Sequence, residues 1–257
     1  MKHAVVVPWV KDEELTSFLK AWHLKLTALP EWLILQRDSQ CEGCGVTKNK
    51  GVVRAVERGA DVVVILDGDC YPSVEANSLE GLLDAHVRAL EPQPVALFRT
   101  VTDPPSRGTP YGDMMLKMPV AASMGFWNQV PDYCAVRQLA FATKPMVFQR
   151  EAIYGSYFAL CGMNLAFRPS DWLPWCQFID VPRFDDIWMG WLWQKEAYQR
   201  GYCFNLNGPL VTHARQSNVW KNLQQEAMNL EANEQLWKAI ATDHHACYAD
   251  LRKLLLC

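Results

Sequence analysis

In the first hundred residues, short runs of consecutive apolar residues alternate with longer segments in which apolar residues recur at helical spacing. Short, continuous apolar runs are typical of buried strands, and they are separated by segments in which apolar residues recur at helical spacing. The apolar runs are residues 3–7, 32–35, 62–66 and 95–98, and the helical segments are residues 12–26, 50–58 and 79–90. Strands that alternate with helices predict a parallel sheet built from βαβ units, and therefore an α/β fold.

The pattern changes in the second half of the chain. Residues from about Thr102 to Pro119 are rich in Pro, Gly, Asp and Met, and a loop of this length in a compact domain is usually functional. Most of the tryptophans then lie between Trp172 and Trp237, a density that indicates core packing. Some of these rings are also candidates for stacking on a base or a sugar.

The apolar run 62–66 ends in Asp67-Gly68-Asp69, which brings two aspartates to the C-terminal edge of a predicted strand. Ligands of open α/β sheets bind beyond the carboxyl ends of the strands, and carboxylates there can hold Mn²⁺ or Mg²⁺ against a nucleotide diphosphate. Gly68 lets the backbone and an ion approach each other closely. The alternative is an ordinary turn after a strand, because Asp and Gly are both common turn residues.

Two later segments carry further candidate groups. Asp185 and Asp186 lie at the predicted start of a helix that runs to Arg200, where an aspartate can also act simply as an N-cap. His213 ends a short predicted strand, and a single histidine is often structural. An Asp-x-Asp after a central strand, an acidic pair at a helix start and a late histidine are together the parts of a GT-A nucleotide-sugar transferase site.

Each part of such a site has a chemical role. A metal ion neutralises the departing diphosphate, and the late histidine can complete its coordination. An acidic residue near the sugar carbon can deprotonate an acceptor hydroxyl or stabilise an oxocarbenium-like centre.

Composition and charge limit the kinds of protein that this chain can be. The chain has 257 residues, 50% of them hydrophobic, which is enough for one large α/β domain or two small ones. A formal charge of −3 gives no overall attraction to nucleic acid, although a local basic groove is compatible with it. No apolar run approaches the roughly 20 residues that span a bilayer, so we expect a cytoplasmic protein with no membrane partner.

The nine cysteines are scattered without a regular framework. In a reducing cytosol they are most simply free thiols of the core. Cys41-Glu42-Gly43-Cys44 could form half of a zinc site or a redox pair, but no partner follows at zinc-finger spacing.

Six short segments of the chain form motifs that are more specific than its composition or its hydrophobic pattern. They are residues 67–70, 107–111, 125–133, 158–167, 183–191 and 213–218. In order and spacing they closely resemble the reversibly glycosylated polypeptides, the UDP-arabinopyranose mutase family, and residues 67–70 lie at that family's aspartate motif. The resemblance covers most of the chain, from the first predicted strand to about Glu226.

The resemblance implies a Rossmann-like GT-A fold with a mostly parallel central sheet, a UDP-sugar as substrate and dependence on Mn²⁺ or Mg²⁺. Members of the family interconvert the pyranose and furanose forms of UDP-arabinose and become glycosylated on an arginine. The implied roles are metal binding by Asp67, Asp69 and His213, catalysis by Asp185, Asp186 and Arg107, and nucleotide-sugar binding by Asp67, Asp69 and Asn164. The alternative role of His213 is a contact with a phosphate. Asp38, at the predicted end of the second strand, adds a ribose or uracil contact.

Two positions need comment. Arg107 matches the family's glycosylated arginine, and its alternative role is that of a loop cation facing the diphosphate or solvent. The family usually has three consecutive acids in the aspartate motif, whereas Gly68 replaces the middle one here. Two metal ligands survive this change, but the chemistry next to the sugar need not be the same.

We expect a single domain over residues 1–257. Residues 1–100 would bind the nucleotide, residues 101–223 the sugar and the acceptor, and residues 224–257 would form a C-terminal helical segment. That segment is a candidate for shaping the acceptor site or a homo-oligomer contact.

Three hypotheses about function remain at this stage. The first is a mutase that returns the sugar to UDP, and the second is a transferase with an external acceptor such as hydroxymethylated DNA. The third is a nucleotide-sugar-binding subunit without catalysis. The second hypothesis needs a basic groove, for which the candidates are Lys48, Lys50, Arg54, Arg58, Arg137, Lys144, Arg150, Arg215 and Lys221.

Overall fold

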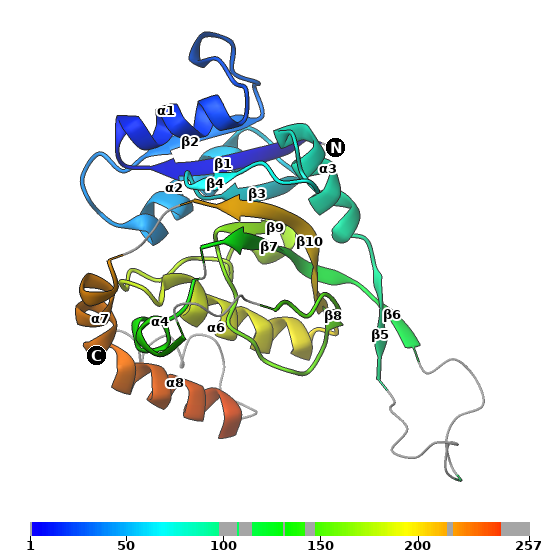
Figure 1. Ribbon diagram of the computed structural model, residues 1–257. Helices are drawn as coiled ribbons and strands as arrows, with labels where there is room; N and C mark the ends of the chain where they lie inside the picture. The colour runs from blue at the N-terminus through cyan, green and yellow to red at the C-terminus, as the bar shows by residue number, and fades with distance from the viewer. Residues whose placement is uncertain are drawn as a thin grey trace.

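The computed structural model describes residues 2–97, 107, 115–130, 132–141, 147–214 and 218–242. Strands and helices alternate through the first third of the chain, as the sequence pattern predicts (Figure 1). In chain order the elements are β1 (His3–Trp9), α1 (Asp12–Ala21), the 3-10 helix η1 (Leu26–Ala28), β2 (Leu33–Arg37), α2 (Cys44–Glu57), β3 (Val62–Leu66), β4 (Cys70–Tyr71), α3 (Leu79–Ala89), β5 (Gln93–Ala96), β6 (Met115–Met118), β7 (Val120–Gln129), α4 (Ala135–Phe141), β8 (Ala152–Ile153), β9 (Asn164–Phe167), α5 (Pro169–Trp172), α6 (Asp185–Gln199), β10 (Cys203–His213), α7 (Val219–Ala227) and α8 (Leu230–Thr242).

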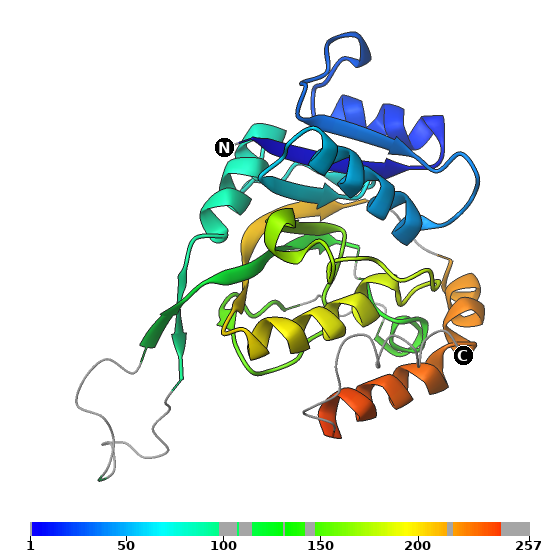
Figure 2. The same ribbon diagram turned by 180° about the vertical axis from the view of Figure 1, so that it is seen from behind.

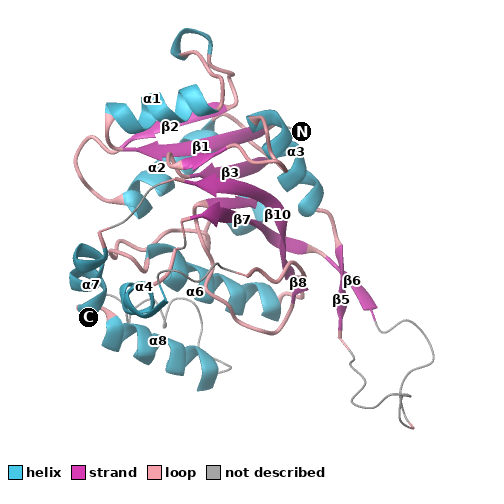
Figure 3. Ribbon diagram, in the orientation of Figure 1, coloured by secondary structure: helices cyan, strands magenta, loops and turns pink. Residues whose placement is uncertain are grey.

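The main sheet has the strand order β2-β1-β3-β9-β7-β10-β4, with β8 paired to β10 (Figure 3). Strands β2, β1 and β3 are parallel to one another, and β10 is parallel to β7. Strand β9 is antiparallel to both β3 and β7, so those two strands share a direction, while β4 and β8 run against β10. Five of these strands therefore point the same way, which confirms the predicted α/β class with a mostly parallel central sheet.

Helices cover the sheet because its central strands are apolar on both faces. All five residues of β3 are buried, as expected for a strand between two layers of helices. Helix α2 packs against β1, β2 and β3, and Figure 2 shows it in front of these strands when the molecule is viewed from behind. Helix α3 packs against β7 and β10, and α6 packs against β10.

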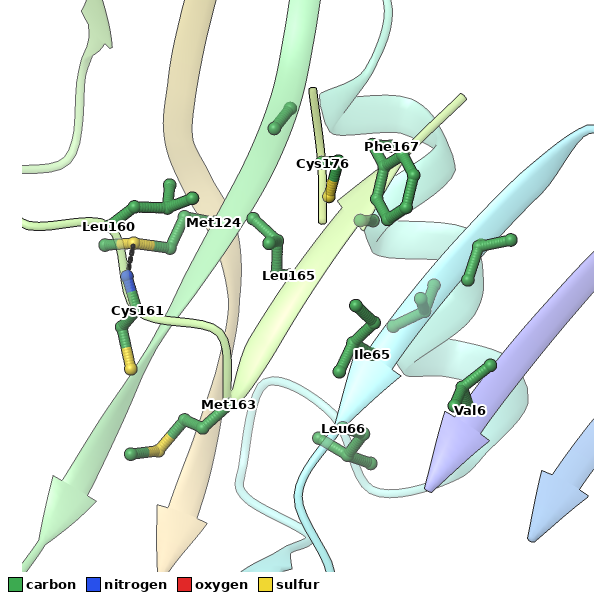
Figure 4. Close-up of a cluster of buried hydrophobic side chains, with 14 of the residues drawn as sticks. Val6, Ile65, Leu66, Met124, Leu160, Cys161, Met163, Leu165, Phe167 and Cys176 are labelled. Carbon is green, nitrogen blue, oxygen red and sulfur yellow. Dashed lines mark hydrogen bonds between the residues drawn. The ribbon is translucent and has the colours of Figure 1, made fainter. Parts of the chain in front are cut away.

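The core around the middle of the sheet brings together residues from both halves of the chain (Figure 4). Val6 of β1 and Ile65 of β3 share it with Leu165 and Phe167 of β9. The expectation that the tryptophans form core is confirmed for three of them, which are at most 2% exposed: Trp172, Trp188 and Trp193. Trp220, in contrast, is 63% exposed.

Some predicted boundaries were wrong. The helix expected at residues 50–58 already begins at Cys44, because its first turns bury glycine and polar side chains that hide the helical spacing. The strand expected at residues 95–98 is β5, which pairs with β6 in a separate two-stranded sheet that extends away from the main sheet (Figures 1 and 2). Residues 115–118, expected to be loop, form β6.

Among the described helices, none has the combination of length and apolar character that crossing a membrane requires.

Candidate functional site

A pocket lies where strands β1, β2 and β3 end. Because these strands are parallel, their carboxyl ends meet at one edge of the sheet, which is where α/β folds bind ligands. Three residues predicted from the sequence, Asp38, Asp67 and Asp69, line this pocket together with Gly68. The other lining residues are Pro8, Trp9, Val10, Glu14, Cys44 and Thr47.

Asp67 is paired with a lysine that the sequence analysis had assigned only to a basic groove. Lys48 of α2 is 3% exposed, and its Nζ lies 2.8 Å from Oδ1 of Asp67. Burial on its own would lower the pKa of Lys48, but the negative charge of Asp67, followed by those of neighbouring groups, raises it well above its usual value. Lys48 is therefore a permanent positive charge at the base of the site.

The acidic pair at the start of α6 lies close to this ion pair. Burial raises the pKa of Asp185, the positive charge of Lys48 opposes that rise, and the charge of Asp67 adds to it. Burial and the charge of Asp185 raise the pKa of Asp186 to about 7, although Lys48 also acts on this group in the opposite direction. The fold thus brings the acidic pair and the aspartate motif into one electrostatic cluster.

Glycines let the acidic pair approach its neighbours. A Cβ atom on Gly45 would lie 3.2 Å from Cβ of Asp185, and one on Gly162 would lie 3.1 Å from Cβ of Asp186. The backbone N–H of Gly162 donates a hydrogen bond of 2.8 Å to Oδ2 of Asp186. The N-cap of α6 is Phe184, so neither aspartate is the N-cap that the alternative interpretation proposed.

Asp69, just before β4, lies next to His213, whose pairing partner in the sheet is Cys70 of β4. Oδ2 of Asp69 lies 3.7 Å from Nε2 of His213, and Nδ1 of His213 lies 3.0 Å from the carbonyl oxygen of Val130. The backbone N–H of Ala214 also donates to the carbonyl oxygen of Asp69. Burial would lower the pKa of His213, but its contacts with Asp69 outweigh burial and raise it.

The three predicted metal ligands are therefore only partly assembled. Asp69 and His213 are neighbours, whereas the carboxylate of Asp67 contacts Lys48. Within the described residues, no group of three or more His, Cys, Asp and Glu side chains is placed to hold a metal ion. The carboxylate oxygens are nevertheless donors that both Mn²⁺ and Mg²⁺ accept, and the imidazole nitrogen suits a transition metal such as Mn²⁺ better than it suits Mg²⁺.

Asp38 lines the pocket but also has a structural function. Its two carboxylate oxygens accept hydrogen bonds from the backbone N–H groups of Glu42 and Gly43, at 2.9 and 3.0 Å. These bonds hold the turn that leads into α2. Asp38 therefore positions the helix that carries Lys48, and its expected contact with ribose or uracil stays a prediction.

Asn164, predicted to bind the nucleotide-sugar, is buried and hydrogen-bonded within the protein. Its side chain has no exposed surface: Oδ1 lies 2.8 Å from Nε2 of His86, and Nδ2 donates to the carbonyl oxygen of Pro209. Nδ1 of His86 in turn lies 2.9 Å from the hydroxyl of Ser123, and burial lowers the pKa of His86 to about 4. These hydrogen bonds satisfy the buried amide and join β9 to α3 and β10. The contact of Asn164 with the nucleotide-sugar stays a prediction.

Arg107 is exposed, and the residues on either side of it lie outside the described ranges. Its assignment as the glycosylated arginine stays a prediction.

Two charged residues, Lys48 and Arg183, lie near the site but were not predicted from the sequence to belong to it. Lys48 lies on the same face of α2 as the buried Val52 and Ala55, and a lysine on an apolar stripe was a readable signal of a buried charge. For Arg183 the sequence carries no such signal. Its Nε donates a hydrogen bond of 3.1 Å to Glu226 of α7 and so connects the C-terminal helices to the start of α6. That pairing joins residues far apart in the chain, so local spacing does not reveal it.

Several known proteins that are similar to this chain are named UDP-arabinopyranose mutases. The model of the family described as reversibly glycosylated polypeptide matches residues 56–242. Probable UDP-arabinopyranose mutase 1 of Pisum sativum is 28% identical over 244 residues, which cover 84% of this chain and 64% of the relative. UDP-arabinopyranose mutase 3 of Arabidopsis thaliana is 27% identical over 247 residues, covering 85% of this chain and 65% of the relative.

A solved glycosyltransferase that is involved in glycosylation of the major capsid of PBCV-1 aligns with 89% of this chain and 100% of its own. Its TM-score of 0.33 and identity of 10% are too low to support an argument about function. The family match is of a different kind, because it covers most of the chain and includes the aspartate motif, the acidic pair and the late histidine. The chain spans just under two thirds of the length of the mutases it matches, and it belongs to the reversibly glycosylated polypeptide family.

Proposed function

We propose that this chain is a UDP-sugar-dependent enzyme of glycosyltransferase type that interconverts the pyranose and furanose forms of UDP-arabinose. Membership of the family and the names of the related mutases support this proposal. The structural observation that carries it is the convergence of Lys48, Asp67, Asp185 and Asp186 at the edge where parallel strands end. Carboxylates whose pKa values are raised, gathered beside a buried cation, favour a catalytic site.

The proposed reaction needs no second substrate. The bond between the anomeric carbon and the diphosphate breaks, and its electron pair stays on the diphosphate. O4 then bonds to the anomeric carbon and loses its proton. The bond between that carbon and O5 breaks as O5 takes up a proton, and the diphosphate then bonds to the anomeric carbon again. A pKa near 7 lets Asp186 take up and return that proton at neutral pH, and Asp185 would stabilise positive charge on the anomeric carbon.

We further propose a Mn²⁺ or Mg²⁺ ion at this site. Asp69 and His213 would hold it, and Asp67 would join them by exchanging its contact with Lys48. When bound, the ion would supply charge neutralisation to the departing diphosphate. Arg107 is the proposed point of sugar attachment on the protein.

The test is to incubate the protein with UDP-arabinopyranose and Mn²⁺ and to follow the nucleotide-sugar by chromatography and the protein by intact mass. We expect UDP-arabinofuranose to form, and an added pentose on the protein. Asp186→Asn should abolish the conversion, whereas Asp84→Asn, a change at an exposed residue of α3, should leave it intact. If UDP-arabinose stays unchanged in the wild-type reaction, the mutase proposal is wrong.

The transferase hypothesis with DNA as acceptor gains no support from the described part of the structure. Lys48 is buried against Asp67 and cannot contact a phosphate backbone. Lys50 and Arg150 of the candidate groove are paired with Glu42 and Glu75. A second incubation with UDP-arabinopyranose and Mn²⁺ should include hydroxymethylated duplex DNA. A gain in the mass of the DNA would favour this alternative.

A further inference from the structure

Glu14, in the first turn of α1, is a pocket residue that sequence patterns did not single out. It lines the same pocket as Asp38, Asp67 and Asp69, although it comes from a helix rather than from a strand end. Its side chain is half-buried, and Oε2 accepts a hydrogen bond from the backbone N–H of Val10 at 3.4 Å. That bond is long for its type, and a carboxylate has about four acceptor positions, so most of its capacity is left for a ligand.

Gly68 makes room for this side chain. A Cβ at position 68 would lie 3.3 Å from Cγ and from Oε1 of Glu14, and 3.3 Å from the carbonyl oxygen of Pro8. The φ angle of Gly68 is outside the left-handed region, so its backbone conformation does not require glycine. A side chain there would press on the carboxylate of Glu14 and on the carbonyl oxygen of Pro8, and these atoms would have to shift by a few tenths of an ångström.

The other carboxylates of the pocket have strong protein partners. Asp38 accepts two backbone hydrogen bonds, and Asp67 pairs with Lys48. Glu14, by contrast, accepts the long hydrogen bond from Val10, which leaves acceptor positions of its carboxylate for a donor on a ligand. A neutral hydroxyl is the donor that suits such a carboxylate, because a diphosphate would be repelled.

We infer that Glu14 binds the ligand in this pocket by accepting a hydrogen bond from a hydroxyl group of the nucleotide-sugar, and that Gly68 is the residue that admits it. The inference rests on the proposed function, since it names a further binding residue of the same site. Both the ribose and the sugar attached to the diphosphate offer such hydroxyl groups.

The test is a calorimetric measurement of UDP and UDP-arabinopyranose binding to the wild type, Glu14→Ala, Gly68→Ala and the double variant. We expect Glu14→Ala to weaken binding about 10- to 100-fold, the range for losing a hydrogen bond to a charged group. Gly68→Ala should weaken it too, and the double variant should bind no more weakly than Gly68→Ala alone, because Glu14 is already displaced there. A loss for both ligands identifies a ribose hydroxyl, and a loss for UDP-arabinopyranose alone identifies a hydroxyl of the sugar.

Glu13→Ala is the matched control. Glu13 is an exposed acid in the same first turn, so its removal has the same effect on the helix dipole and should leave binding unchanged. Melting temperatures of all variants check that each is folded. If the wild type binds and Glu14→Ala binds equally well, Glu14 serves only the start of α1 and the inference is wrong while the proposed function stands. If the wild type binds neither ligand, both are wrong.

Discussion

At the scale of single residues, the site is organised around one buried positive charge. Lys48 contacts Asp67 directly, and its charge acts on Asp185 and Asp186 as well. Gathering three half-buried carboxylates would be costly without a counter-charge, and the ammonium group lowers that cost for all three. The lysine is therefore as necessary to this arrangement as the acids are.

Replacing Lys48 with methionine should expose this dependence. The variant keeps most of the side-chain volume but leaves the half-buried Asp67 near two other half-buried acids without their counter-charge. We expect the free energy of unfolding to fall by about 3 kcal/mol, the lower end of the range for breaking a buried ion pair. Urea denaturation measures this, and Lys50→Met, at an exposed pair with Glu42, is the control that should change it by less than about 1 kcal/mol. Equal stability of the two variants would contradict the assignment.

The pKa of Asp186 predicts how stability depends on pH. A carboxyl group whose pKa in the folded state is raised to about 7 destabilises the fold in its charged form. This penalty is complete above pH 7 and disappears as the pH falls through 7 toward the pKa of the unfolded chain. Asp186→Asn should therefore raise the melting temperature by a few degrees at pH 8 and by clearly less at pH 5. A gain that is the same at both values of pH would show that Asp186 is not the titrating group.

At the scale of elements, α2 connects the two halves of the site. It carries Lys48, and the next residue, Asn49, forms two hydrogen bonds with the backbone of Phe178, at 2.8 and 2.9 Å. Phe178 lies in the segment that leads to α6, and its ring lies 5.1 Å from Nζ of Lys48. Helix α2 thereby fixes where α6, and with it the acidic pair, begins.

Asn49→Ala should consequently affect both stability and turnover, although Asn49 is not among the residues that line the pocket. Losing two hydrogen bonds with partly buried partners should lower the free energy of unfolding by about 2 kcal/mol. The turnover of UDP-arabinose should fall as well, because the acidic pair is no longer held at its position next to Lys48. The control is Glu57→Ala, at an exposed position of the same helix. Unfolding curves and turnover rates that match those of Glu57→Ala would refute this role.

At the scale of the whole molecule, charge separates the two enzymatic hypotheses. A net charge of −3 and a site made of acids suit a small nucleotide-sugar, and cationic residues such as Lys50 and Arg150 are paired with acids. The conversion of UDP-arabinose should therefore change less than about three-fold between 50 and 200 mM salt. An enzyme that binds DNA through 6–10 phosphate contacts would lose about 10³- to 10⁵-fold in affinity over the same range. A steep loss of activity with salt would favour the DNA acceptor.

Much of the fold and part of the site could be predicted from the sequence, because the signals concerned are local. A buried strand is a continuous apolar run, so β3 and the aspartates that follow it, Asp67 and Asp69, can be recognised without any partner strand. The acidic pair was recognisable for the same reason, as two adjacent residues at a helix start. The antiparallel strand β9, inserted between β3 and β7, was not predicted, because strand order depends on which apolar runs pack together.

What the sequence by itself determined is thus the alternation of strands and helices, the place of Asp67 and Asp69 at a strand end, and the resemblance to one family. Only the tertiary structure decided that Lys48 pairs with Asp67, that Asn164 is satisfied inside the core, and that Gly68 leaves room for Glu14. The physical reason is the same in each case. Burial and pairing of polar groups depend on contacts between segments far apart in the chain, and no local pattern of residues specifies those contacts.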